Sequence, residues 1–264
     1  VGALSVYKGQ SLIGDAIGHA TFPGVVLAFM AFSTRSPAVL LVGAMAAAAV
    51  TFFAIQAAHE NTRVGLNANL AIFLSGFFGL GMVLKSFIQG NEAYRGASQA
   101  GLETYIFGQA AYMLEADVKL IAFVAALCAA LLFAFYKELK VFVFDAEYAR
   151  AVGLPVRLLQ VLLPFLTIAV IGIGIKAVGA ILISSFLIIP CVAASQWSDN
   201  FSRVLFLSAV FGVVAALLGT YASTLEQGMS TGPSIILAAS AIAFLSMFFG
   251  KRGAFRKRGR REEA

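Results

Sequence analysis

The sequence predicts an all-α, polytopic membrane protein with about eight transmembrane helices. Hydrophobic residues make up 60% of the 264 residues, and charged residues make up only 12%, against about 25% in a soluble globular domain. The mean hydropathy is +0.90. This composition leaves too few polar side chains to cover a surface in contact with water, so it excludes a soluble domain.

Seven long segments contain no Asp, Glu, Lys or Arg, and each approaches or exceeds the roughly 20 apolar residues of a membrane-spanning helix. They are residues 36–58, 64–84, 120–136, 158–175, 177–198, 204–225 and 227–250. A shorter segment at about 14–33 brings the expected number to eight, or nine if an upstream span is missing before Val1. The sequence lacks the alternating ten-residue segments of a membrane β-barrel, so we expect the spans to be helices.

The excess of positive charge lies at the end of the sequence. The net charge is +6, and seven cations fall within KRGAFRKRGRREEA, residues 251–264. A basic segment directly after a span marks the cytoplasmic side by the positive-inside rule, and it can contact anionic lipid. We therefore predict a transmembrane domain at 1–250, a basic cytoplasmic tail at 251–264, and no nucleic-acid binding.

Counting spans back from a cytoplasmic tail assigns each connection to one side of the membrane. The predicted inside segments are 59–65, 137–157 and 198–203, and the predicted outside segments are 33–36, 89–117 and 223–231. Cations favour the inside segments and carboxylates favour the outside ones. The assignment is therefore consistent with the charge distribution.

The stretch SLIGDAIGHATFPG, residues 11–24, places Asp15 and His19 four residues apart. On a helix these side chains lie one above the other on one face, where a carboxylate oxygen and an imidazole nitrogen can hold one divalent cation. Mixed oxygen and nitrogen ligands suit manganese, ferrous iron or zinc, and the stretch offers no thiolate to trap a soft metal. An ionised aspartate inside the membrane costs about 2.5–3.5 kcal/mol, so we expect it to face a cavity. Water, backbone or a second subunit must supply the remaining ligands.

Pro23 follows His19 by four residues and has no N–H to bond the His19 carbonyl. We expect the freed oxygen to coordinate the ion or one of its waters. Purely structural interpretations stay open: Asp15 can lie near a helix start, where the dipole favours a carboxylate, and His19 can be hydrogen-bonded within the bundle. Gly14 and Gly18 form a pair of small residues that is typical of helix packing.

Extended to SLIGDAIGHATFPGVVLAF, this stretch resembles the signature of the metal-importing ABC transporter permeases, which bring manganese, zinc or iron into bacteria. Three further segments resemble the same family in the expected order: DAEYARAVGLP at 145–155, KAVGAILISSFLIIPCVAAS at 176–195 and STGPSIIL at 230–237. The resemblance covers nearly the whole chain. It implies a metal site at Asp15 and His19 in the translocation path of a protein of the bacterial plasma membrane. It also implies three partners: cytoplasmic ATPase subunits, a second permease chain, identical or paralogous, and an extracytoplasmic metal-binding protein.

The segment EYARAVG has the form Glu-x-Ala-x-x-x-Gly, with Glu147, Ala149 and Gly153. The resemblance implies that it is the helix that docks into the ATPase, within a coupling loop at 137–157. Glycine supplies the left-handed backbone at a helix end, and a small alanine permits close contact. Tyr148 departs from the usual pattern, in which a second alanine often stands. A solvated loop helix is the alternative.

Several motifs are absent from the sequence. No G-x-x-x-x-G-K-[ST] phosphate loop occurs, so we expect ATP to be hydrolysed by another polypeptide and the chain itself not to be an enzyme. The HENTR segment at 59–63 lacks the second histidine of a zinc protease. Cys128 and Cys191 lie in separate apolar segments and indicate small hydrophobic residues rather than a disulfide or zinc site. Pro190 is expected to kink or break a helix.

These observations predict the permease subunit of an ATP-driven importer of a divalent transition metal, with no bound cofactor apart from the transported ion. Manganese, zinc and iron all stay open at this stage. One alternative is a secondary metal transporter, which typically carries several intramembrane carboxylates and inverted repeats. Another is a vitamin or metal-chelate permease, which has no need of the Asp15 and His19 pair.

Overall fold

The computed structural model describes residues 1–34, 36–91, 113, 115–179, 182–225 and 229–251, and all regular elements within these ranges are helices. The helices are α1 (Gly2–Tyr7), α2 (Ser11–Phe32), α3 (Pro37–Asn61), α4 (Leu66–Gly90), α6 (Glu115–Ala134), α7 (Tyr136–Phe144), α8 (Ala146–Ala151), α9 (Val156–Val178), α10 (Ile183–Ser195), α11 (Phe201–Ser223) and α12 (Thr231–Phe249). The predicted all-α class is confirmed. Most of the predicted outside segment 89–117, and all of the predicted tail 251–264 beyond Lys251, lie outside the described residues.

Seven of the described helices are long and apolar enough to cross a membrane by length and composition: α2, α3, α4, α6, α9, α11 and α12. The remaining predicted span, at 177–198, corresponds to α10, which has 13 residues. The expected number of about eight spans is therefore close. Helix α9 ends at Gly179, which has a φ of 98°. Glycine adopts this positive φ more readily than other residues do. Pro190 lies inside α10 and does not break it.

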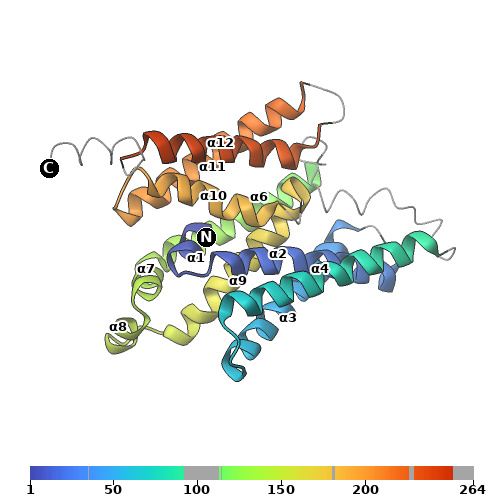
Figure 1. The fold of residues 1–264 in the computed structure, drawn as a ribbon, viewed down its shortest axis with the longest axis horizontal. Coiled ribbons are helices and arrows are strands. Elements are labelled where there is room, and N and C mark those ends of the chain that lie inside the picture. The colour runs from blue at the N-terminus through green and yellow to red at the C-terminus, as the bar shows by residue number, and fades with distance from the viewer. Residues whose placement is uncertain (35, 92–112, 114, 180–181, 226–228, 252–264) are drawn as a thin grey trace.

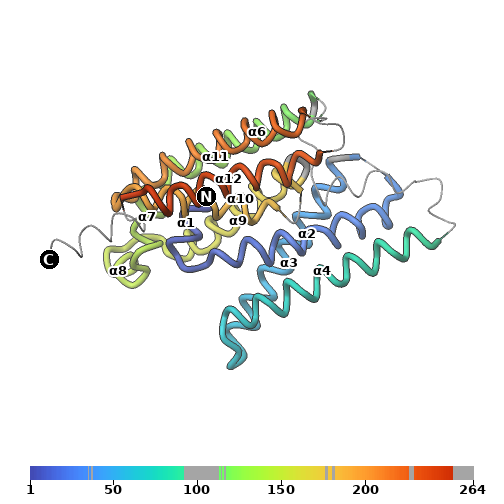
Figure 2. The backbone as a smooth tube through the Cα atoms, turned by 45° about the horizontal axis from the view of Figure 1, so that its top comes forward, coloured from blue at the N-terminus to red at the C-terminus, as the bar shows by residue number. Residues whose placement is uncertain are grey.

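The spanning helices form two groups. In the first, α2 packs against α3 and α4; in the second, α10, α11 and α12 pack against one another (Figure 1). Figure 2 shows α2, α3 and α4 on one side of the molecule and α11, α12 and α6 on the other. Helices α9 and α10 both contact α2. They therefore join the two groups next to the helix that carries Asp15 and His19.

The short helices α7 and α8 lie at one end of the molecule, where α12 also ends (Figure 1). The Tyr136 hydroxyl of α7 is 2.7 Å from the Ser202 hydroxyl at the start of α11. A methyl group on Gly250 would lie 2.7 Å from the Gln196 Cβ, which places the ends of α10 and α12 together. The predicted inside segments 137–157 and 198–203 therefore share one end of the molecule with residue 250.

Helix α2 is the most buried of these seven spans. Its most apolar window is 72% buried, compared with 56% for α9 and 28% or less for the other five. Its window is also the least hydropathic of the seven, 1.4 against 1.8–2.4, and the small and polar residues of a membrane helix face the bundle interior. The others present large exposed side chains, such as Phe53 on α3, Phe133 on α6 and Phe206 on α11, on surfaces suited to lipid or to other membrane chains.

Helices α2 and α3 cross closely at two glycines. A methyl group on Gly24 would lie 2.5 Å from the Ala47 Cβ, and one on Gly43 would lie 2.6 Å from the Gly24 carbonyl oxygen. Small residues allow such a close approach, from which membrane helices gain van der Waals contact. At Gly14 the space is looser, since the nearest atom to an added methyl group would be the Leu187 Cδ1 at 3.8 Å. The close approach of α2 to α3 at Gly24 therefore lies beyond the segment that carries Asp15 and His19.

We predict that Gly43→Ala destabilises the protein, because the added methyl group meets backbone and Ala28 atoms that have no flexible end to move. Overpacking of this kind costs about 1–3 kcal/mol. The matched control is Gly79→Ala in α4, where an added methyl group meets nothing within 4 Å. Thermal unfolding in detergent, followed by circular dichroism, should show a lower midpoint for Gly43→Ala alone. Equal midpoints for the two variants would contradict the prediction.

Candidate functional site

The structure brings Asp15 and His19 together on α2. Their positions four residues apart place the His19 Nε2 atom 3.5 Å from the Asp15 Oδ1 atom. The His19 side chain is 14% exposed and the Asp15 side chain 31% exposed. The Asp15 carboxylate is therefore partly exposed although it lies on the most buried of the seven spans.

Two neighbouring helices complete the surroundings of the pair. The Ser184 hydroxyl of α10 donates a hydrogen bond of 2.7 Å to the Asp15 Oδ1 atom. The Phe78 ring of α4 meets the His19 imidazole edge to face, with ring centroids 5.1 Å apart. The site is therefore built from α2, α4 and α10, although the sequence motif lies on α2 alone.

The His19 ring uses only one of its nitrogens within the described residues. Its Nε2 atom faces Asp15, whereas its Nδ1 atom is buried and has no hydrogen-bond partner among the described groups. Hydrogen bonds to the described residues therefore do not use both nitrogens of the His19 ring. A neutral imidazole with one unbonded nitrogen keeps capacity for a ligand or a water.

The described residues contain no group of three or more His, Cys, Asp or Glu side chains that could hold a metal ion. Asp15 and His19 thus lie together on one face of α2, as the spacing predicts, and are two candidate ligands. One further oxygen is offered by the backbone, because Pro23 lies inside α2 and brings no N–H to the His19 carbonyl. Helix α4 closes over this turn: a methyl group on Gly81 would lie 3.1 Å from the Pro23 Cδ atom.

The predicted docking segment forms a well-capped short helix at the end of the molecule. The Asp145 carboxylate accepts the Tyr148 N–H at 2.8 Å and caps the start of α8. At the other end, Gly153 has a φ of 79°, and its N–H bonds the Arg150 carbonyl while the Leu154 N–H bonds the Ala149 carbonyl. This is a Schellman motif, so the left-handed backbone expected at Gly153 is confirmed.

The side chains of α8 divide into an inner and an outer face. Ala149 is fully buried and belongs to a core with Leu139, Phe142 and Leu159 of the same chain. Glu147, Tyr148 and Arg150 are exposed. The small alanine therefore lets α8 pack closely on α7 and α9, and the exposed side chains form the surface that is free for another protein.

An aromatic cluster of Tyr7, Phe144 and Phe201 ties α7 to α1 and α11. The Tyr7 ring centroid lies 5.6 Å from that of Phe144 and 5.2 Å from that of Phe201. Beside it, the Lys8 ammonium group lies 3.9 Å from the centroid of Phe142, where it gains a cation–π contact. Burial lowers the pKa of Lys8 to about 8. Lys8 lies between α1 and α2. Helix α7, at the same end of the molecule as α8, therefore packs against the segment that leads into α2.

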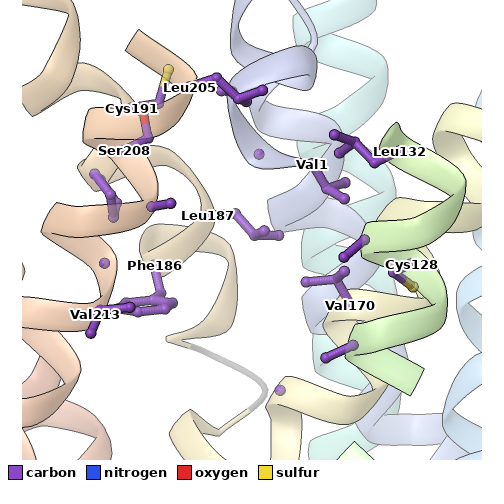
Figure 3. Close-up of a pocket in the computed structure, with 18 of the residues that line it drawn as sticks. Val1, Cys128, Leu132, Val170, Phe186, Leu187, Cys191, Leu205, Ser208 and Val213 are labelled. Atoms are coloured by element: carbon purple, nitrogen blue, oxygen red, sulfur yellow. The ribbon is translucent and has the colours of Figure 1, made fainter. Parts of the chain in front are cut away.

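A pocket of about 910 Å³ opens elsewhere, among α1, α6, α9, α10 and α11, and neither Asp15 nor His19 lines it. Figure 3 shows its largely apolar walls, with Cys128 and Cys191 on opposite sides. Both cysteines are free and buried. They behave as small hydrophobic residues, as their sequence context predicts.

Sequence reasoning missed Ser184 and Phe78. Ser184 belongs to a pair of serines in the apolar stretch ILISSFLIIP, which lies within the predicted span 177–198. The available signal was the presence of two hydroxyl groups in a segment otherwise free of them. Phe78 stands among many aromatic residues of α4 and offers no such signal.

Comparison with known proteins places these features in a family. The sequence model described as the ABC 3 transport family matches residues 1–250. The manganese transport system membrane protein MntC of Bacillus subtilis is 37% identical over 254 residues, covering 96% of this chain and 58% of that protein. The zinc transport system membrane protein TroC of Treponema pallidum is 36% identical over 250 residues, covering 95% of this chain and 83% of that protein.

A solved structure has the same fold. PsaBC from Streptococcus pneumoniae, in complex with Fab, matches with a TM-score of 0.82 and 27% sequence identity. The match covers 100% of this chain and 88% of that chain. The matched region therefore includes the break before α10 and the short helices α7 and α8.

Proposed function

The chain belongs to the ABC 3 transport family, and on that premise we propose that it is the permease subunit of an ATP-driven importer for manganese, zinc or iron. The observation that carries this proposal is the Asp15 and His19 pair, with 3.5 Å between ligand atoms on the most buried spanning helix. Relatives are named as manganese, zinc and chelated iron transport system membrane proteins. Ionic ligands inside a membrane are costly, and binding an ion in transit is a function that requires them.

The ligands of the pair suit a transported ion. A carboxylate and an imidazole accept manganese, ferrous iron and zinc alike. Two side chains, supplemented by water, the His19 carbonyl or a second permease chain, make an incomplete site. Such a site releases its ion more readily than a closed four-ligand cage, as transport requires. The exposed part of Asp15 leaves room for the additional ligands.

The energy source lies on partner subunits. The sequence has no phosphate loop, so we propose that cytoplasmic ATPase subunits dock on the exposed face of α8. Glu147, Tyr148 and Arg150 supply this face, while Ala149 and Gly153 shape the helix that presents it. An extracytoplasmic metal-binding protein delivers the ion at the opposite end, and a second permease chain completes the path. The basic end of the chain then lies in the cytoplasm.

We predict that Asp15→Asn and His19→Gln each lower metal uptake by about tenfold or more, because each replaces one of the two candidate side-chain ligands among the described residues with a neutral amide that binds a divalent cation more weakly. The measurement is ATP-dependent manganese uptake into proteoliposomes that contain the whole complex, with zinc and iron as competitors. Glu115→Gln is the matched control, since this carboxylate at the start of α6 is exposed and pairs with Lys119 at 2.7 Å. Uptake that persists without nucleotide would favour a secondary transporter, and normal uptake by Asp15→Asn would exclude the proposed site.

We predict that Pro23→Ala reduces uptake or changes the preference among metals, since alanine restores an N–H that can bond the His19 carbonyl. The control is Pro164→Ala, because Pro164 also lies inside a spanning helix, α9, but away from the pair. Uptake and competition profiles are compared for both variants. If Pro23→Ala matches the wild type in both respects, the His19 carbonyl has no part in binding.

We predict that Glu147→Lys weakens ATPase docking and leaves the fold intact, because this side chain is exposed on α8. Copurification of the ATPase subunit with the tagged permease in detergent measures the effect, and thermal unfolding monitors the fold. The control is Glu115→Lys, the same charge reversal at the opposite end of the molecule. Full ATPase recovery with Glu147→Lys would remove this face of α8 from the docking surface.

A further inference from the structure

Ser184 forms a hydrogen bond that joins two helices far apart in the sequence. Its hydroxyl on α10 donates to the Asp15 Oδ1 atom of α2 at 2.7 Å, across 169 positions of the chain. Ser184 is 1% exposed. The accepting oxygen is the same one that lies 3.5 Å from the His19 Nε2 atom. Two polar side chains, Ser184 and His19, therefore approach the same oxygen of the Asp15 carboxylate.

Several other hydroxyl groups in the spanning helices bond their own backbone. Ser208 donates to the Val204 carbonyl, Thr167 to the Leu163 carbonyl, and Ser234 to the Ser230 carbonyl. Ser184, the second residue of α10, instead donates to a carboxylate on another helix.

The bond constrains the metal-binding side chain. An aspartate can rotate about two side-chain bonds, and its 31% exposure shows that packing does not enclose it. A hydroxyl that donates to a carboxylate at 2.7 Å lies within the range of charge-assisted hydrogen bonds, which are stronger than neutral ones. The bond therefore holds the Asp15 carboxylate beside His19. Holding a ligand in place in this way raises metal affinity in many sites.

We propose that Ser184 is a positioning residue of the metal site: its hydroxyl holds the Asp15 carboxylate in the orientation in which Asp15 and His19 bind a divalent cation. The inference rests on the proposed function and adds to it a residue outside the α2 motif. It also makes the site depend on the position of the first turn of α10. The neighbouring Ser185 is not part of this arrangement.

The test measures binding of manganese alone to the purified whole complex by isothermal titration calorimetry. We expect Ser184→Ala to weaken binding by about 10- to 100-fold, in the range found for residues that orient metal ligands. Ser184→Thr keeps the hydroxyl and should bind within a few-fold of wild type. Ser185→Ala, one position along the same helix, is the matched control and should bind as wild type.

The outcomes separate the inference from the proposed function. Wild-type binding by Ser184→Ala overturns the inference, and so does weak binding by Ser184→Thr, because the loss would then come from packing rather than from the hydroxyl. Asp15→Ala is measured alongside. If Asp15→Ala also binds manganese as wild type, the proposed metal site itself fails; if only Asp15→Ala loses binding, the site stands without a role for Ser184.

Discussion

An ionised carboxylate inside an apolar bundle is the constraint on which this structure depends. Placing Asp15 on a spanning helix costs about 2.5–3.5 kcal/mol by insertion scales, and the chain meets that cost with the nearby His19 and the Ser184 hydroxyl. Both partners require α2 to lie in the interior and α10 to begin beside it. The order in which the helices pack therefore follows from where this charge must be.

Small residues make that order geometrically feasible. Gly24 and Gly43 let α2 and α3 approach until an added methyl group on either would overlap the other helix, and Gly81 lets α4 close over Phe22 and Pro23. These contacts lie three residues or more beyond His19. Asp15 itself keeps a side chain that is 31% exposed on the same helix.

The sequence alone predicted the local features well and the long-range ones poorly. Runs without charge located the spans, and a spacing of four placed Asp15 and His19 on one face, because both patterns follow from helix geometry. Pro190 was expected to kink or break a helix, but it lies within α10, and the break in the predicted span 177–198 occurs at Gly179, where a φ of 98° ends α9. Ala149 was expected to face a partner, yet it lies in the core of its own chain. Ser184 depends on a contact across 169 positions, which no local pattern encodes.

The exposed face of α8, which is the proposed docking surface, and the Asp15 and His19 pair are connected through helices that pack against one another. Helix α8 rests on α7 through the buried Ala149, α7 meets α1 through Tyr7 and Phe144, and α1 leads directly into α2. Phe201 joins the same cluster and begins α11, which packs against α10. Packed side chains therefore connect α8 to both helices beside Asp15, to α2 through α1 and to α10 through α11. Because Ser184 and His19 lie on different helices, unequal movement of α2 and α10 changes the distance between them and, with it, the hold on the carboxylate.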